Sequence, residues 1–390
     1  MNAESFELTI PSPGSTTSQR ILSLAIQQSA HELLRLEPVP GASRASTESV
    51  VRARAAFAAV ARKTPGALFA SLRRPTVSAL LRCQRDRTDL ARAARIQMEL
   101  VATLLLDLAL FDVLEAPVRV EGELPRELLS ITHTRSAAVT SDVLVFRSGS
   151  IEGVAFREGS APYTLVDGGV WLAERDNNPI SMFEAHPDKH GNAIDLGGKP
   201  ASDWVTSLRD SLALIAEHLP ELRRELDQFS QLVVPVGYHA ERHESASYRE
   251  AIGTIYMTLH PHLMTMAEAV IHEGSHNKLN AFFETDEVLL NGDSPLYTSP
   301  VRPDPRPLRG VLLAVHAFIP VARLYEKMVD ARDARVNPSF LSRFEAVRRI
   351  NAEGFKLLAE HARPTAKGRS LMDELARWIA HYERYSAPAG

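Results

Sequence analysis

The spacing of apolar residues predicts that the first part of the chain is helical. Leucine, isoleucine, valine and alanine recur three and four positions apart there, as on one face of an α-helix. The segments with this pattern are residues 21–36, 50–62 and 89–114. Pro117 then interrupts the pattern, because proline cannot continue a helical hydrogen-bond ladder. We therefore expect an all-helical region over about the first 115 residues.

Beyond Pro117 the pattern changes to short segments in which β-branched and aromatic residues are frequent. Gly, Ser and Asp, which favour turns, separate these segments. The segments are residues 142–147, 151–157, 163–166 and 169–174. Their short spacing predicts a small antiparallel sheet. Residues 177–201 are rich in Asn, Pro, Asp, His and Gly and predict a long connection, in which we interpret His186 and His190 as surface histidines rather than metal ligands.

Helical spacing returns in the second half of the chain, with two short apolar strands between the helices. The predicted helices are residues 202–231, 263–282, 308–329, 338–362 and 371–385, and the predicted strands are 232–236 and 253–259. Several prolines between residues 295 and 307 exclude a regular element there.

These patterns predict an α+β fold that is mainly α-helical, with a small antiparallel β-sheet. We expect three regions along the chain. They are a helical region over residues 1–116, a small β-rich region over 117–201 and a mainly helical region over 202–390.

Composition places the chain among ordinary globular proteins. Hydrophobic residues make up 45% and charged residues 24% of the 390 residues, and 44 basic against 48 acidic residues leave a net charge of −4. This balance provides no general attraction to nucleic acid or to an anionic membrane surface. Cys83 is the only cysteine, which excludes a disulfide framework and a thiolate metal cluster.

Targeting signals do not change this picture. Residues 1–15 lack the basic start and the long apolar core of a signal peptide. The most apolar segment, residues 98–114, has an uncharged run over only residues 100–106, which is too short to span a membrane. We expect a cytoplasmic protein with no nucleic-acid or membrane partner, and its oligomeric state stays open.

The sequence His272-Glu273-Gly274-Ser275-His276 is an HExxH motif in a predicted helix. On a helix, positions i and i+4 share a face one turn apart, so both imidazoles can bind one metal ion. The glutamate between them lies about 100° round the helix axis, near the metal. With 14 histidines among 390 residues, chance would produce about 0.03 such motifs per chain. The motif therefore indicates a metal site, the alternative being a helix with two surface histidines beside a glutamate.

A metal site needs a further ligand from elsewhere in the chain. The metzincin continuation HExxHxxGxxH is excluded, because Leu279 and Phe282 occupy the positions of its glycine and last histidine. A glutamate from a following helix would be Glu326, and Glu284 is another candidate. We prefer His316, which lies in an apolar predicted helix. A hydrogen-bonded core histidine is the alternative at that position.

Three blocks of sequence around the motif resemble a known enzyme family. The blocks are HESASYREAIGTIYMTL from residue 243, AEAVIHEGSHNKLNAF from residue 267 and LYTSPVRPDPRPLRGVLLAVHAFIPVA from residue 296. In this order they are similar to the HExxH-type 2-oxoglutarate-dependent peptide β-hydroxylases of ribosomal-peptide gene clusters. The resemblance is specific over residues 232–323 and loose over the helical N-terminal part. It departs at Leu313, where many relatives carry a histidine one turn before the position of His316.

The resemblance implies an iron(II)- and 2-oxoglutarate-dependent dioxygenase. Such an enzyme would use O2 to hydroxylate a β-carbon in a precursor peptide, with His272, His276 and His316 as iron ligands. Three protein ligands leave three positions on the metal for the 2-oxoacid and for oxygen. Glu273 would then orient a ligand or a metal-bound water rather than act as a proteolytic base.

The distal carboxylate of 2-oxoglutarate needs a cationic partner, and the planar fork of arginine suits this task better than lysine. Arg302, Arg306, Arg309 and Arg323 lie near His316 in the sequence. Arg309 and Arg323 are each seven residues from His316, hence on its helix face about 10 Å along the axis. We expect one of the four to bind the cosubstrate, and a solvated surface arginine is the alternative for each.

Two other functions stay open at this level. A zinc metallopeptidase would use Glu273 to activate a zinc-bound water, and a metal-stabilised peptide-binding protein would have no turnover. Ser245 and Ser247 lie close to His239 and His243 but lack the Gly-x-Ser-x-Gly elbow of serine hydrolases. We therefore expect His243, Ser245 and Ser247 to line the peptide-binding channel. The chain has no dinucleotide fingerprint and no P-loop.

Overall fold

A computed structural model describes residues 7–159, 161–182, 194–298 and 304–386. Its helices are α1 (Thr17–Leu34), α2 (Arg44–Lys63), α3 (Pro65–Leu72), α4 (Pro75–Cys83), α5 (Leu90–Leu110), the 3-10 helix η1 (Pro179–Met182), α6 (Ala201–His218), α7 (Pro220–Phe229), α8 (Leu263–Phe283), α9 (Leu308–Asp330), α10 (Pro338–His361) and α11 (Ala366–Arg384). Its strands are β1 (Val118–Glu121), β2 (Glu127–Ser130), β3 (Arg135–Val139), β4 (Val143–Arg147), β5 (Ser150–Glu152), β6 (Val154–Phe156), β7 (Tyr163–Asp167), β8 (Val170–Ala173), β9 (Ser230–Tyr238), β10 (Ser245–Ala246), β11 (Gly253–Leu259), β12 (Leu296–Tyr297) and β13 (Arg306–Pro307).

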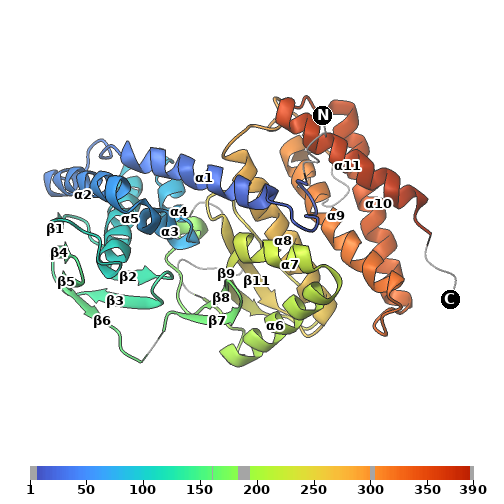
Figure 1. The fold of residues 1–390 in the computed structure, drawn as a ribbon, viewed down its shortest axis with the longest axis horizontal. Coiled ribbons are helices and arrows are strands. Elements are labelled where there is room, and N and C mark those ends of the chain that lie inside the picture. The colour runs from blue at the N-terminus through green and yellow to red at the C-terminus, as the bar shows by residue number, and fades with distance from the viewer. Residues whose placement is uncertain (1–6, 160, 183–193, 299–303, 387–390) are drawn as a thin grey trace.

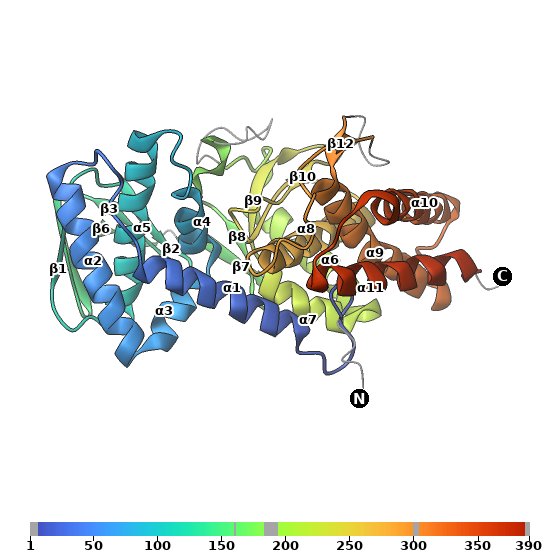
Figure 2. The same cartoon turned by 90° about the horizontal axis from the view of Figure 1, so that it is seen from above.

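The fold is α+β and mainly helical, which confirms the predicted fold class. Figure 1 shows an elongated molecule in which α2–α5 and the small sheets of β1–β6 lie at one end, and α9–α11 lie at the other. The sheet that contains β7–β11 lies between them. Helix α1 runs from α2 and α3 to α7 and α8, as the view from above also shows (Figure 2). It therefore connects the N-terminal helices to the helix that carries the HExxH motif.

The central sheet is mixed rather than purely antiparallel. Its strand order is β10-β11-β9-β8-β7, and β9 runs parallel to both β8 and β11. The outer pairs, β10 with β11 and β7 with β8, are antiparallel. Strands β9 and β11 are buried along almost their whole length, as expected for inner strands covered on both faces.

The predicted strand over residues 151–157 is in fact two strands that belong to different sheets. Strand β5 pairs with β4, whereas β6 pairs with β3. Gly153 separates them with a positive φ of 84°, and a Cβ at this position would lie 2.4 Å from the carbonyl oxygen of Val143. Only glycine allows the chain to turn here, so one continuous strand is excluded.

The predicted helix over residues 202–231 is likewise divided. Helix α6 ends at His218 and α7 begins at Pro220, because proline has no N–H to continue the first helix but is favourable at the first position of the next. The last two residues of the predicted helix belong to β9. Two short helices without a predicted counterpart, α3 and α4, also begin at prolines.

The division of the chain into three regions stays a prediction. One buried apolar cluster contains Phe57, Leu128 and Val234, which come from the helical, the β-rich and the HExxH region respectively. A second cluster joins Ile21 and Leu22 of α1 to Leu279 of α8. The core that surrounds the HExxH helix is thus built in part by the N-terminal helices.

Helix α8 follows β11 and packs against α6, α7 and α9. It approaches its neighbours closely at Gly274, where a Cβ would lie 2.4 Å from Cδ2 of Leu226 and 2.6 Å from Oγ of Ser230. This is well inside van der Waals contact, so the absence of a side chain at Gly274 lets α7 and β9 reach the backbone of α8.

Helix α9 is long and apolar enough to cross a membrane by length and composition alone. In the structure, 78% of its most apolar window is buried inside the protein, as in the core helix of a globular protein. It packs between α8 and α10. Pro320 lies inside it and has no N–H to donate to the carbonyl of His316, four residues earlier.

A cavity of about 1010 Å³ lies far from α8, between α5 and the connections β1–β2 and β3–β4. Glu99 lines it together with Asn177 and with basic side chains that include Arg92 and Arg95. Burial raises the pKa of Glu99 to about 7, and the charge of Asp176 acts in the same direction. Glu99 is therefore a carboxyl group that titrates near neutral pH.

Candidate metal centre

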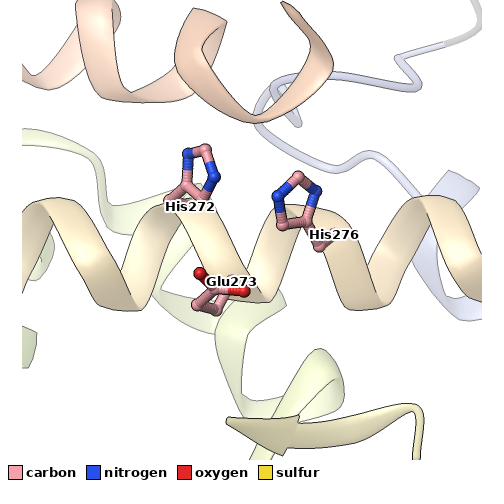
Figure 3. A group of neighbouring side chains, drawn as sticks. All are labelled: His272, Glu273 and His276. Atoms are coloured by element: carbon pink, nitrogen blue, oxygen red, sulfur yellow. The ribbon is translucent and has the colours of Figure 1, made fainter. Parts of the chain in front are cut away.

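The two histidines of the HExxH motif lie one turn apart on one face of α8. Their ring centroids are 4.4 Å apart, with the ring planes at 82°. With Glu273 they form a group whose potential ligand atoms all lie within 4.8 Å of one another. Figure 3 shows the imidazoles of His272 and His276 side by side on one side of α8 and Glu273 on the other. The predicted motif residues thus form a candidate metal-binding group.

The two histidines are the least buried residues in the middle of α8. Between residues 271 and 280, His272 and His276 are half-buried, and every other residue is buried. The ring of His272 also lies 4.5 Å from the ring of Phe318 on α9, so this face of α8 looks toward α9. A metal ion held by the two imidazoles would be supported by a rigid, buried helix and would keep an accessible side, as a catalytic site requires.

Glu273 is held by two hydroxyl groups. Ser245 Oγ donates to Oε1 at 2.8 Å, and Ser247 Oγ donates to Oε2 at 2.7 Å. Both serines lie on the same face of the extended segment that starts at β10, because side chains at i and i+2 share a face. The Glu273 side chain is buried, with the residue only 3% exposed. We predicted Ser245 and Ser247 in the peptide channel, and the structure places their hydroxyls against Glu273.

His243 lies at a separate histidine cluster. Its ring centroid is 6.2 Å from that of His260, which is 5.2 Å from that of His262. Burial lowers the pKa of His243 to about 4, and the charge of His260 acts in the same direction. The sequence analysis did not single out His260 and His262. The available signal was the His-Pro-His sequence over residues 260–262, which places two imidazoles in the short connection between β11 and α8.

His316 is buried on α9, and its ring makes a hydrogen bond through one nitrogen. Its Nε2 lies 2.8 Å from the carbonyl oxygen of Leu8, so Nε2 carries the proton and donates it. Nδ1 is buried and has no hydrogen-bond partner among the described residues. Burial lowers the pKa of His316 to about 3, and the charges of Lys278 and His276 lower it further.

This geometry leaves His316 near the HExxH group but outside it. The close group consists of His272, Glu273 and His276. His316 lies two residues before Phe318, whose ring contacts that of His272. Nδ1 of neutral His316 offers a lone pair that the described part of the chain does not use. Because the Leu8 carbonyl holds the His316 ring, a shared metal would require His272 and His276 to adjust toward this atom.

The two glutamates considered as alternative third ligands are both paired with cations. Glu326 lies 2.7 Å from Arg323 and 2.8 Å from His381. Glu284 lies 2.8 Å from Arg85 and 3.4 Å from Arg82. Each carboxylate is 3% exposed in its side chain and is neutralised by its partners. These pairs favour His316 over both glutamates.

The candidate arginines for 2-oxoglutarate each form an ion pair. Arg306 lies 2.8 Å from Asp304, and Arg309 lies 2.8 Å from Asp293. Arg323 pairs with Glu326, as described above. Arg302 lies outside the described residues, as do His186 and His190.

A second group with metal-ligand chemistry is formed by Glu217, His218 and Asp333. Arg335 pairs with both carboxylates, at 3.1 Å from Glu217 and in direct contact with Asp333. The hydrogen bonds from Arg335 hold the pKa of Asp333 well below its usual range. The internal cation already balances these charges, so we interpret this group as an ion-pair cluster.

No protein-family model matches the chain, and no curated protein matches it in sequence.

Proposed function

We propose that the protein is an iron(II)- and 2-oxoglutarate-dependent oxygenase that hydroxylates a β-carbon of a residue in a ribosomally synthesised peptide. In this proposal His272, His276 and His316 bind the metal. The partners are the peptide, 2-oxoglutarate and O2, and the reaction takes place in the cytoplasm. The proposal combines the family resemblance of the sequence with the geometry around α8.

The hydrogen bonds of Glu273 are the observation on which we base the choice between the two enzyme classes. A peptidase needs this carboxylate as a general base, with a lone pair directed at a metal-bound water. Here both carboxylate oxygens accept hydrogen bonds from the two serines of the segment starting at β10. These contacts favour a positioning role, in which Glu273 and its serines hold α8 and its histidines in place.

The residues present fit a metal. Two half-buried imidazoles one turn apart offer two nitrogen ligands, and Nδ1 of His316, which has no hydrogen-bond partner among the described residues, offers a third. All three are the borderline nitrogen ligands that ferrous iron and zinc both accept. Bound iron would supply the activation of O2, coupled to oxidative decarboxylation of 2-oxoglutarate.

Of the three described candidate arginines, Arg306 has the most exposed side chain, and we assign the cosubstrate to it. Its side chain is 39% exposed and that of its partner Asp304 is 54% exposed. An exposed ion pair of this kind contributes only about 0–1 kcal/mol, so a carboxylate of 2-oxoglutarate can replace Asp304 at little cost. Arg309 is less accessible, with a side chain 18% exposed, and its guanidinium also lies over the ring of Phe283.

The test begins with protein purified without oxygen, in which bound iron and zinc are measured. Ferrous iron, 2-oxoglutarate and air are then added, and succinate is quantified. We expect succinate from the wild type, none from His272→Ala, and unchanged formation from His239→Ala, a half-buried histidine outside the group. Peptide cleavage with zinc, independent of 2-oxoglutarate, would establish the peptidase instead. The absence of metal from the wild type would refute both enzyme classes.

The peptide part of the proposal needs its own measurement. Incubation with a short precursor peptide encoded beside the gene should add one oxygen atom, about 16 Da by atomic mass, without cleavage. Fragmentation in the mass spectrometer then locates the added oxygen on a β-carbon. If the reaction forms succinate but the peptide stays unmodified, the oxygenase assignment is supported and this peptide is not its substrate.

A further inference from the structure

The N-terminal segment lies against the candidate metal centre. Leu8 and Thr9 are 4% and 1% exposed. Their backbone contacts side chains of three helices that are far away in the sequence, α8, α9 and α11. In Figure 3 the N-terminal segment, in faint blue, passes on the side of α8 that carries the two imidazoles. This burial is unusual for a segment without regular structure.

Glu374 of α11 holds the N–H groups of the segment. Its carboxylate accepts from the backbone N–H of Leu8 at 2.6 Å and of Thr9 at 2.9 Å, and from the hydroxyl of Thr9. Glu374 is 4% exposed, so its charge is compensated by these three donors. A buried carboxylate without them would be strongly unfavourable.

Lys278 of α8 holds the carbonyl groups of the same segment. Its ammonium donates to the carbonyl of Thr9 at 3.3 Å and of Glu7 at 3.4 Å, and it pairs with Glu225 at 2.7 Å. Lys278 is 1% exposed and lies two residues after His276. The segment is therefore clamped between an anion on α11 and a cation on α8.

Between these two clamps the carbonyl of Leu8 accepts the Nε2 proton of His316 at 2.8 Å. A neutral imidazole has one proton, so this bond selects the tautomer in which Nδ1 carries the lone pair. It also fixes the plane of the ring. Backbone carbonyls play this part for the second nitrogen of metal-binding histidines in many proteins.

We propose that residues 7–9 are a positioning element of the metal centre, in which Glu374 and Lys278 hold the Leu8 carbonyl so that His316 presents Nδ1 to the metal. The inference rests on the proposed role of His316 as a ligand. It extends that proposal by assigning a function to the N-terminal segment and to two buried charges that are not themselves ligands.

The test measures metal affinity by competition with a coloured chelator, with zinc as the probe and the full chain in every case. Glu374→Ala removes the anion that holds Leu8, and we expect its affinity to fall about 10- to 100-fold, the usual loss when such a supporting contact is removed. Asp373→Ala, which removes the exposed neighbouring carboxylate on α11, is the matched control and should leave the affinity unchanged. Glu374→Gln keeps an acceptor oxygen and should restore part of the affinity.

A double-mutant cycle separates positioning from general stability. If Glu374 acts through His316, then Glu374→Ala causes no further loss of affinity in a His316→Ala background. An equal loss in both backgrounds would refute the proposal, as would wild-type affinity in Glu374→Ala. Nitrogen-15 spectra of labelled histidine in the metal-free protein provide a second readout. They should show the proton of His316 on Nε2, and a mixture of tautomers in Glu374→Ala.

The same measurements distinguish failure of this inference from failure of the proposed function. If His272→Ala retains zinc, the HExxH site itself is wrong. If His272→Ala loses zinc and His316→Ala retains it, the HExxH site stands and the role of His316, with that of residues 7–9, is refuted.

Discussion

The hydroxyl of Ser245 donates to Oε1 of Glu273 at 2.8 Å, across a separation of 28 residues. Ser247 completes the arrangement on Oε2. The pair connects β10, at the edge of the central sheet, to the middle of the HExxH helix. Each oxygen of the Glu273 carboxylate thus accepts one hydrogen bond from a serine. Substitution of Glu273 tests whether the carboxylate acts as a general base or positions α8.

The variant Glu273→Gln separates the two enzyme classes. A peptidase would retain zinc and lose hydrolysis, since loss of a general base costs about 10² to 10⁴ in rate. In the oxygenase no water needs deprotonation, so we expect retained iron and a loss of only about 10- to 100-fold in succinate formation. The measurement is succinate and intact peptide mass for both proteins. Zinc-dependent cleavage that vanishes in the variant would decide for the peptidase.

Removing either motif histidine should remove the metal without unfolding the protein. The chain has large buried clusters that do not depend on the ion, so His272→Ala and His276→Ala should keep a native far-ultraviolet circular dichroism spectrum. Metal content per chain and the spectrum are measured on the same samples. Stoichiometric iron in either variant, or an unfolded metal-free protein, would contradict the assignment.

Substitutions at His316 test the third ligand. His316→Ala should lose metal, whereas His316→Asp should retain part of it, because a carboxylate restores the common set of two histidines and one carboxylate. The aspartate cannot donate to the Leu8 carbonyl, so we expect weaker binding than in the wild type. Chelator competition measures both. Full oxygenase activity in His316→Ala would transfer the role to another residue.

Glu99 makes the stability of the fold depend on pH near neutrality. Its pKa is about 7 in the folded protein against 4.5 as the ordinary value, because burial disfavours the ionised form. Below pH 4.5 the group is protonated in the folded and in the unfolded state, so its titration does not change the free energy of unfolding. Above pH 7 it is ionised in both, and the difference in pKa corresponds to at most about 3 kcal/mol of lost stability. Wild-type stability should therefore fall as the pH rises through this window.

Chemical denaturation of Glu99→Gln at pH 4 and pH 8 measures this effect. The free energy of unfolding of the variant minus that of the wild type should be larger at pH 8 than at pH 4, by at most about 3 kcal/mol. Glu123→Gln is the control, since Glu123 lines the same cavity but is exposed, and its charge stays in water. Parallel pH profiles for the wild type and Glu99→Gln would exclude a buried titrating group.

The close contacts around Gly274 predict that even alanine at this position destabilises the fold. Gly274→Ala places a methyl group against Leu226 and Ser230, and we expect the free energy of unfolding to fall by about 1–3 kcal/mol, as for other overpacked sites. Gly310→Ala on α9 is the matched control. Its Cβ would meet neighbours only at 3.7 Å, so the helix preference for alanine should stabilise the fold by up to about 1 kcal/mol. Denaturant titration measures both variants.

Local features of the site followed from the sequence. The helix around His272 and His276 was evident from its apolar spacing, and the i, i+4 rule placed both rings on one face. The partners of these residues were not evident, because periodicity describes one element at a time. The hydroxyls that hold Glu273 come from a different strand, and the carbonyl bound by His316 is 308 residues away. Such contacts depend on tertiary packing.

The difference between local pattern and tertiary contact also explains where the predicted fold was wrong. Apolar patterning located the segments between residues 142 and 174 but did not say which strands pair, and β7 and β8 join a mixed sheet through the distant strand β9. The break at Gly153 follows from steric contact with Val143, which the sequence alone does not reveal. Pro220 was a readable signal for the end of α6, since proline starts helices and does not continue them.

The clamp on residues 7–9 also sets an order of assembly. Leu8 leaves the ribosome early, yet the carboxylate that binds its N–H belongs to Glu374, synthesised 366 residues later. Translation proceeds at about 5–20 residues per second, so the two groups are separated by tens of seconds of synthesis. During that interval His316, once made, has no fixed partner for its Nε2 proton. If His316 is a ligand as proposed, the metal site can take its final form only after nearly the whole chain has been translated, so an oxygenase of this design would stay inactive until it is folded.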